Sequence, residues 1–212
     1  MTGKEKNFFL LSCALLLGVV CLVFVRMKQM ARPMLTTATL SLFHIEEREH
    51  FTPDKGQFIL IQFGDYECPA CYGQQKAVDL LLMQNVGKLR LIWRQFPLEK
   101  IHPNAHQVAL LSEIARAQGQ FDTVHHRLMA LQGHLTKHDL KDILQLAKID
   151  YMTLLNTKGS SEKRVQEDKA LAEVLGCRGT PMFYLATPEG KVYHLRGLHE
   201  VGSFLPVKTT NS

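Results

Sequence analysis

The chain has 212 residues, of which 46% are hydrophobic and 21% charged, a globular composition that argues against extensive disorder. Its formal net charge is +5, but residues 1–34 hold five basic groups and a single acid, Glu5, so the rest of the chain is nearly neutral. This balance predicts no nucleic-acid partner.

The first feature in chain order is an apolar run without charges over residues 8–25. At about 1.5 Å per helical residue it is just long enough to cross a bilayer. A cleaved signal peptide has a shorter apolar region closely followed by a small-x-small site, whereas the first such triplet here is Thr36-Thr37-Ala38. We therefore favour a retained N-terminal transmembrane helix over a cleaved signal. Basic residues flank both ends of the run, so the charge rule gives no orientation.

The chain divides by composition into four parts. Residues 1–34 form a membrane anchor, or an uncleaved signal, with basic flanks. Residues 35–55 are a tether interrupted by Pro53, residues 56–205 are a folded domain, and residues 206–212 are a tail.

The folded domain begins with a strand-helix-strand pattern. Residues 57–63 are apolar with β-branched and aromatic side chains, which is typical of a buried strand. Pro69 suits the first turn of a helix that continues to about Gln84, and residues 88–96 predict a second strand. This order predicts a βαβ unit with two parallel strands.

A helical insertion follows at about residues 103–175. Apolar residues recur at helical spacing in four stretches: 105–117, 122–131, 139–148 and 162–175. Glycines, Gly159 among them, punctuate the insertion. The strand pattern then returns in residues 182–186 and 191–196, which predict a β-hairpin.

The residues with the clearest chemistry are Cys68-Pro69-Ala70-Cys71, between the first strand and its helix. The partial positive charge at a helix N-terminus stabilises a thiolate at Cys68. Cys71, one turn further on, can close on Cys68, so one sulfur can attack while the other resolves a mixed disulfide. A single CxxC can also be half of a zinc site, but no second CxxC exists to complete four thiolates.

Several segments around this motif resemble the DsbA family of thioredoxin-like proteins. They are Phe63 to Cys71, Phe96-Pro97-Leu98, His102-Pro103-Asn104-Ala105, Gln118-Gly119-Gln120-Phe121 and Gly179-Thr180-Pro181, which resembles the cis-proline loop of the family. The resemblance covers roughly residues 56–205. It implies an α/β, thioredoxin-like fold with an inserted helical subdomain, here preceded by the predicted N-terminal transmembrane helix.

The resemblance also implies roles for individual residues. Cys68 is then the nucleophile and Cys71 the resolving thiol, so these two are the expected catalytic residues. The expected substrate-binding residues are Pro69 and Ala70 of the motif together with Thr180 and Pro181 of the loop.

Two positions depart from the family pattern and are expected to modulate the site. Many family members have a buried carboxylate six residues before the first cysteine, where this chain has Gln62. Proton transfer then needs water or another group, for which Glu67 is a candidate. Because Asp65 and Glu67 place negative charge beside Cys68, we expect its pKa in the upper part of the range of about 3.5 to 7.5.

The remaining cysteines predict no disulfide framework. Cys13 and Cys21 lie in the apolar run, where they behave as small apolar residues. Cys177 is expected to be a buried small hydrophobe, with a regulatory or mixed-disulfide role as the alternative.

Two histidine pairs have the i, i+4 spacing of a metal clamp, His102 with His106 and His134 with His138. No acidic or cysteine ligand is arranged beside them in sequence, so we expect solvated helix faces and no metal site. Trp93 lies in a predicted strand and is expected to be core.

The sequence thus predicts a single-pass, membrane-anchored thiol-disulfide oxidoreductase without cofactors, forming or rearranging disulfides in secreted or envelope proteins. Because disulfides persist in oxidising compartments, we expect the domain outside the cytoplasm, on the bacterial inner membrane. Its expected partners are cysteine-containing proteins and a membrane redox partner. The alternatives are a disulfide isomerase or reductase, and a thiol carrier of copper or zinc.

Overall fold

The computed structural model describes residues 17–21, 34–35, 43–45, 54 and 56–205. The chain separates into two compact units, Met1–Met34 and Leu35–Ser212. Of the predicted membrane run over residues 8–25, the described part is residues 17–21, which are helical. No helix among the described residues combines the length and apolar character needed to cross a membrane. The rest of that run lies outside the described residues.

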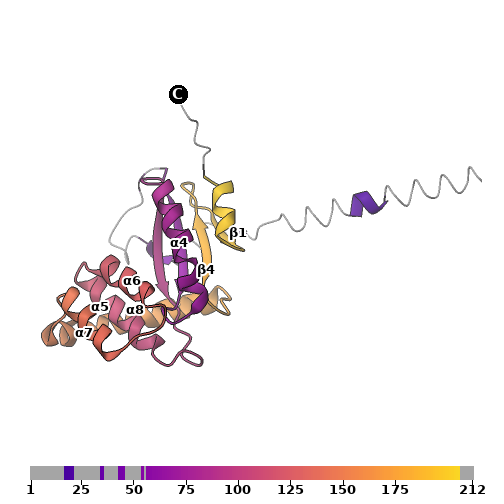
Figure 1. Cartoon of the computed structure of the whole chain (residues 1–212). Helices are drawn as coiled ribbons and strands as arrows, with labels where there is room; N and C mark the ends of the chain where they lie inside the picture. The colour runs from indigo at the N-terminus through magenta and orange to yellow at the C-terminus, as the bar shows by residue number, and fades with distance from the viewer. Residues whose placement is uncertain (1–16, 22–33, 36–42, 46–53, 55, 206–212) are drawn as a thin grey trace, which may run out of the picture. The chain divides into compact units, whose positions relative to one another are not determined.

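The strands form a five-stranded mixed sheet in the order β1-β5-β4-β2-β3, and β2 to β5 form the centre of the second unit (Figure 1). Its strands are β1 (Met34–Leu35), β2 (Phe58–Gly64), β3 (Leu89–Gln95), β4 (Met182–Ala186) and β5 (Val192–Leu195). Strands β2 and β3 are parallel, and β4 is antiparallel to both β2 and β5. The predicted βαβ unit and hairpin are therefore confirmed, in a thioredoxin-like α/β sheet.

The helices fall into two groups. In Figure 1, α4 (Pro69–Gln84) runs alongside the strands, while the others gather beyond one end of the sheet. These are α5 (Ala105–Ala117), α6 (Phe121–Ala130), α7 (Lys137–Leu146) and α8 (Tyr151–Val174), and a 3-10 helix, η2 (Leu198–Ser203), ends the described chain.

Helix α8 differs from the prediction that a helix begins at residue 162. It begins at Tyr151, because the side chain of Asp150 accepts a hydrogen bond from Thr153 N at 2.8 Å and caps the first turn. Gly159 lies inside α8 and does not interrupt it. The cost of about 1 kcal/mol for one helical glycine is small beside the burial of Val165 and Ala172 in a 24-residue helix.

The core occupies both faces of the sheet, because successive side chains along a strand point to opposite faces. On one face, Leu60 of β2 and Phe183 of β4 pack with Val78 of α4. On the other face, Phe63 and Tyr184 pack ring against ring, with centroids 5.9 Å apart. Val78, in the middle of α4, thereby packs the helix against the sheet. The N-terminus of α4 lies at the end of the sheet where β2 ends.

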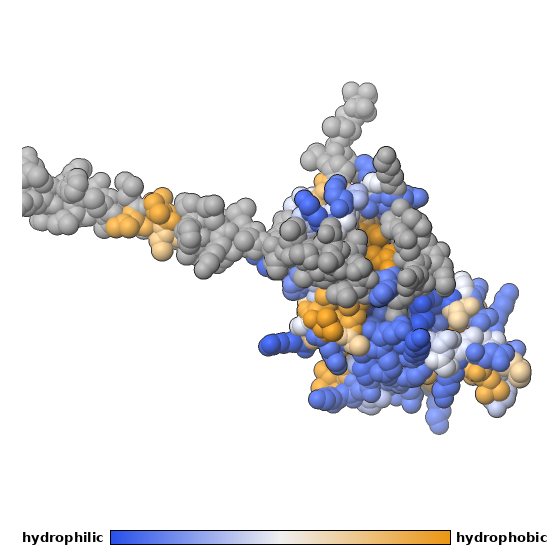
Figure 2. All heavy atoms as spheres, turned by 180° about the vertical axis from the view of Figure 1, so that it is seen from behind, coloured by the Kyte–Doolittle hydropathy of each residue, from blue (hydrophilic) through white to orange (hydrophobic). Residues whose placement is uncertain are grey.

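The surface in Figure 2 is mainly hydrophilic, with separate hydrophobic patches. Exposed apolar side chains cluster where α7 gives way to α8: Leu146, Tyr151, Met152 and Leu155. Single exposed apolar residues are common on soluble domains and need no special role.

Trp93 is core, as predicted, and its position requires a glycine on the neighbouring strand. It is 1% exposed, and its ring centroid lies 4.9 Å from that of Tyr66, in a tilted pair, and 4.8 Å from that of His125, in an edge-to-face pair. A Cβ atom at Gly64 would lie 2.1 Å from the Trp93 ring. Gly64 thus lets β2 end directly beneath the indole, immediately before the turn that leads to Cys68.

We expect Gly64→Ala to destabilise the fold by about 1 to 3 kcal/mol, because the added methyl overpacks the Trp93 contact. The matched control is Gly73→Ala in α4, where nothing lies within 4 Å of the added methyl. The control should gain about 0.5 to 1 kcal/mol from helix propensity. Urea unfolding midpoints measure both, and equal midpoints for wild type and Gly64→Ala would contradict the packing account.

Candidate redox-active site

Cys68 stands at the N-cap position of α4, directly after the turn that follows β2. Its N–H donates to the carbonyl of Asp65 at 3.1 Å, and its own carbonyl accepts from Cys71 N–H at 3.0 Å. Pro69 occupies the first helical turn, where its missing N–H costs nothing. The Cys68 sulfur therefore lies in the favourable field of the helix N-terminus.

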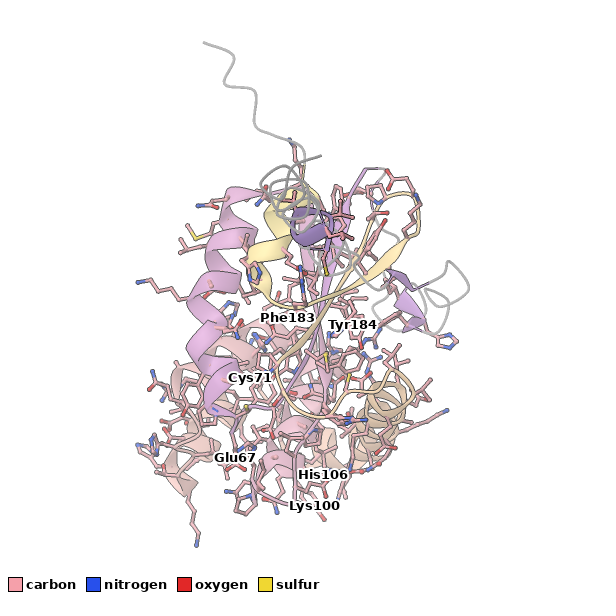
Figure 3. The ribbon with its side chains drawn as sticks, turned by 90° about the vertical axis from the view of Figure 1, so that its right-hand side faces the viewer. Glu67, Cys71, Lys100, His106, Phe183 and Tyr184 are labelled. Carbon is pink, nitrogen blue, oxygen red and sulfur yellow. The ribbon has the colours of Figure 1, made fainter. Side chains whose placement is uncertain are left out.

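The two sulfurs differ in their access to solvent. Both are free thiols, but Cys68 is 7% exposed and Cys71 is fully buried. Pro69 and Ala70 between them are exposed. Figure 3 shows Cys71 near the end of α4 and close to the strand that bears Phe183 and Tyr184. An approaching protein can therefore reach Cys68 past Pro69 and Ala70, while Cys71 is shielded.

The loop before β4 lies against Cys68. The Thr180–Pro181 peptide bond is cis, as predicted. The Cys68 thiol donates to the carbonyl oxygen of Thr180 across 3.4 Å, although the two residues are 112 positions apart. The structure thus brings both cysteines and the proline loop into one site, and Thr180 and Pro181 are each partly exposed beside it.

The electrostatics of the site separate the two thiols. A hydrogen bond from Cys71 is the main cause that lowers the pKa of Cys68 from 9.0 to about 5. Burial opposes this effect, while the Thr180 side chain and the N–H groups of Cys71 and Ala70 add to it. The same sulfur-sulfur hydrogen bond, together with burial, raises the pKa of Cys71. Cys68 is therefore a thiolate at neutral pH and Cys71 a thiol.

Asp65 and Glu67, the carboxylates expected to oppose the thiolate, are not among the main causes that set the pKa of Cys68, and both are bonded to other donors. Asp65 is buried, and its carboxylate accepts from Glu67 N at 2.8 Å, Leu98 N at 2.8 Å and His102 Nδ1 at 2.7 Å. These bonds tie the turn before Cys68 to the segment after β3. They also give a reason for the Phe96-Pro97-Leu98 and His102-Pro103 segments singled out in the sequence, since both supply donors to Asp65.

Glu67 points toward the helical subdomain. Its carboxylate accepts from the backbone N–H of Asn104 at 2.8 Å and from the Asn104 amide at 2.9 Å. Asn104 is the N-cap residue of α5, so Glu67 satisfies a donor at the start of that helix. Figure 3 places Glu67 beyond the end of α4 that holds Cys71. Its contacts are structural, and its role in proton transfer stays a prediction.

Gln62 is fully buried in β2. It lies opposite Phe183 and shares the face of the sheet that α4 covers. Neither atom of its side-chain amide has a hydrogen-bond partner in the described part of the chain. An amide at this position cannot take up a proton as a carboxylate would, so a modulating role for Gln62 stays a prediction.

Cys177 and His106 have contacts of their own outside the redox pair. Cys177 is buried, as predicted, with its sulfur 3.6 Å from the Tyr184 hydroxyl, and burial raises its pKa. His106 contacts Glu162 at 3.0 Å. Within the described residues, no group of three or more histidine, cysteine or acidic side chains has the arrangement of a metal site.

No sequence pattern pointed to His125, which is 2% exposed and packed among aromatic rings. Its Nδ1 lies 3.1 Å from the Tyr66 hydroxyl, and burial lowers its pKa to about 3. His125 is therefore neutral at physiological pH.

We expect thiolate absorbance of the reduced chain to titrate with a midpoint near pH 5, from Cys68. Cys71→Ala should raise this midpoint most, because it removes the strongest stabilising hydrogen bond. Thr180→Val should raise it less, because the Thr180 side chain lowers the pKa of Cys68 less than Cys71 does. A midpoint near 9 in the wild type, or a larger shift in Thr180→Val than in Cys71→Ala, would contradict this ranking.

The same pKa predicts how the stability of the reduced chain depends on pH. Because the pKa of Cys68 falls from 9.0 to about 5 on folding, its thiolate adds stability that is complete above pH 9 and is lost as pH falls through 5. The slope of unfolding free energy between these values should approach about 1.4 kcal/mol per pH unit. Denaturant titrations of Cys68→Ser should lack this contribution, and an equal slope in that variant would contradict the assignment.

Comparison with known proteins agrees with this site. Residues 59–201 match the DSBA-like thioredoxin domain family. Among solved structures, a thioredoxin-like oxidoreductase from Silicibacter pomeroyi DSS-3 is 26% identical, with a TM-score of 0.51 over 64% of this chain and 78% of its own. BdbD from Bacillus subtilis is 19% identical, with a TM-score of 0.58 over 71% of this chain and 86% of its own, which shows a shared fold.

Curated relatives include proteins named Na(+)/H(+) antiporter NhaA 1, for example from Mycobacterium sp. (strain KMS). That protein is 32% identical over 145 residues, which are 66% of this chain and 24% of the relative. The chain thus spans about a quarter of the length of this relative. The match of the family over most of the described domain, with the paired thiols and the cis-proline loop in place, shows that the chain belongs to the DSBA-like thioredoxin domain family.

Proposed function

We propose that this chain forms disulfide bonds in other proteins through the Cys68-Cys71 pair. The observation that carries the proposal is the stabilised thiolate of Cys68, with a pKa of about 5, at the N-terminus of α4 and beside Thr180. A stabilised thiolate is a good leaving group, and it favours the reduced state of the pair. The disulfide form of such a pair is a strong oxidant, which supports oxidation of substrates over reduction.

The reaction begins with the Cys68-Cys71 disulfide. A substrate thiolate attacks the Cys68 sulfur, and the bond to Cys71 breaks. The electron pair leaves on Cys71, which takes a proton because its pKa is raised. A second substrate thiolate then attacks the substrate sulfur of the mixed disulfide and releases Cys68 as a thiolate. Two substrate thiols are oxidised to one disulfide, and one enzyme disulfide is reduced to a thiol and a thiolate.

The substrate approaches where the site is open. Pro69 and Ala70 are exposed on one side of Cys68, and Thr180 and Pro181 are partly exposed on the other. The Thr180 carbonyl oxygen lies 3.4 Å from the Cys68 sulfur and accepts a hydrogen bond from it when Cys68 is protonated. An extended substrate segment that passes this loop would bring its own sulfur close to Cys68, which supports a substrate-binding role for these four residues.

The location of the chain belongs to the same proposal. Residues 8–25 are uncharged and apolar with basic flanks, which supports a single-pass anchor in the bacterial inner membrane. A disulfide-forming domain needs an oxidising compartment, so it faces the periplasm or cell exterior. Its reoxidation then requires a membrane partner that accepts electrons from Cys68 and Cys71. The antiporter name of the longer relatives describes those proteins, and we propose no ion transport here.

Oxidation is tested with reduced, unfolded ribonuclease A as the thiol substrate. The oxidised chain should introduce disulfides into it while losing its own Cys68-Cys71 disulfide in equal amount. Cys68→Ser should abolish the transfer. Cys71→Ala, which cannot form the Cys68-Cys71 disulfide, should also fail to oxidise reduced ribonuclease A, but its Cys68 thiolate should attack a disulfide of scrambled, oxidised ribonuclease A and remain trapped as a mixed disulfide, visible on a non-reducing gel. Exchange without net oxidation would favour an isomerase, and insulin reduction by the reduced chain would favour a reductase.

The carrier alternative has a separate test. In the described part of the chain no third histidine, cysteine or acidic group joins the pair in a metal-site arrangement. Metal analysis of the freshly purified, reduced chain should therefore find less than one copper or zinc per chain. Stoichiometric metal that is lost in Cys68→Ser would overturn the oxidoreductase proposal in favour of a carrier.

A further inference from the structure

A groove of about 340 Å³ lies between α4, β3 and α6, outside the redox site. Its volume is within the range of small-ligand and peptide pockets. Helix α4 contributes Gln75, Asp79 and Leu82 to it. These residues follow Cys68 by seven to fourteen positions, which is about 10 to 21 Å along the helix. The groove therefore lies along α4 away from Cys68, and a molecule can bind in it without contacting the redox pair.

The floor of the groove is the outer edge of β3, the last strand of the sheet. Two hydrogen bonds show which residues of β3 bond to β2. Phe58 N donates to Lys88 O at 2.8 Å, and Phe96 N donates to Gly64 O at 2.8 Å. In a parallel ladder alternate residues bond to the neighbouring strand. The even-numbered residues of β3 therefore bond to β2, and the odd-numbered residues direct their N–H and C=O groups away from the sheet.

Three of these outward groups have partners. Leu89 N donates to Asn85 O at 2.9 Å, and Gln95 N donates to Asp168 Oδ2 at 3.0 Å. The Trp93 carbonyl accepts from Arg116 at 3.4 Å. Among the described residues, the N–H and C=O of Leu91 and the N–H of Trp93 have no partner outside the ladder. Leu91 and Trp93 both line the groove.

Two side-chain atoms add to this set. The Nε2 atom of His125 and the Oε1 atom of Gln75 are buried and lack partners in the described chain. Both residues line the groove, and His125 is 2% exposed. Buried polar atoms usually have a hydrogen-bond partner, so unpaired atoms in one groove point to a ligand that supplies donors and acceptors.

We propose that this groove binds an extended segment of an unfolded polypeptide, which adds to the sheet as a strand along β3. A strand supplies an N–H and a C=O for Leu91 and a C=O for Trp93, residues about 7 Å apart along β3. Other backbone N–H and C=O groups of the bound segment can pair with Gln75 Oε1 and His125 Nε2. This binding goes beyond the proposed redox function, because it involves neither Cys68 nor the Thr180–Pro181 loop.

The test uses reduced, carboxymethylated α-lactalbumin, an unfolded protein whose blocked cysteines cannot react with Cys68. Fluorescence anisotropy of the labelled probe with the full chain should show saturable binding. Hydrogen exchange at Leu91 and Trp93 should slow in the complex. An absence of binding, or protection confined to the Thr180–Pro181 loop, would overturn the proposal.

The decisive variant is Leu91→Pro, which removes the outward N–H without removing a ladder bond, since proline is tolerated on the open side of an edge strand. Its matched control is Leu91→Ala, which shortens the side chain and keeps the N–H. We expect Leu91→Pro to weaken binding about three- to tenfold more than Leu91→Ala. Equal affinities in the two variants would overturn the proposal.

A second variant keeps the test independent of the fold of Leu91→Pro. Gln75→Met removes the unpaired oxygen at similar size, and it should weaken binding about threefold.

Sedimentation should find the chain monomeric, because a dimer lost in Leu91→Pro would mean that a second copy occupies the edge. Oxidation of ribonuclease A should be retained in these variants. A wild-type chain that oxidises ribonuclease A without binding the probe rejects the groove alone, and one that binds the probe without oxidising ribonuclease A rejects the redox function alone.

Discussion

The site depends on one hydrogen bond, from the Cys71 thiol to the Cys68 sulfur at the N-terminus of α4. It is the largest influence on both sulfurs, and it acts on them in opposite directions. Burial would by itself favour two neutral thiols. The bond from Cys71, with the groups of Thr180 and Ala70, outweighs burial at Cys68 and produces one thiolate and one thiol from two identical side chains.

The surrounding structure holds that geometry in place. Asp65 satisfies three donors from three segments, and so fixes the turn that presents Cys68. Glu67 joins the same turn to α5 through Asn104. Removing the buried Asp65 carboxylate would cost about 1 to 3 kcal/mol or more, since it leaves its donors unsatisfied. The helical subdomain is therefore part of the support of the redox pair.

Local patterns predicted the elements that carry the site. The apolar run before Gly64, Pro69 at the helix start and the hairpin after Pro181 were each identifiable because their signals lie within a few residues. The predicted start of α8 at residue 162 was wrong, because Gly159 was given more weight than the cap at Asp150 and the packing of Val165. The partners of Asp65 and the open edge at Leu91 depend on contacts between distant segments, which no local pattern in one sequence contains.

The most direct test of the central claim is the reduction potential of the Cys68-Cys71 pair, measured by equilibration with glutathione. If the Cys68 thiolate stabilises the reduced state as described, the potential should lie closer to the value of about −120 mV of strong oxidants than to the −270 mV of thioredoxin-type reductants. A potential near −270 mV would contradict the account, because the thiolate would then give the disulfide form no oxidising power.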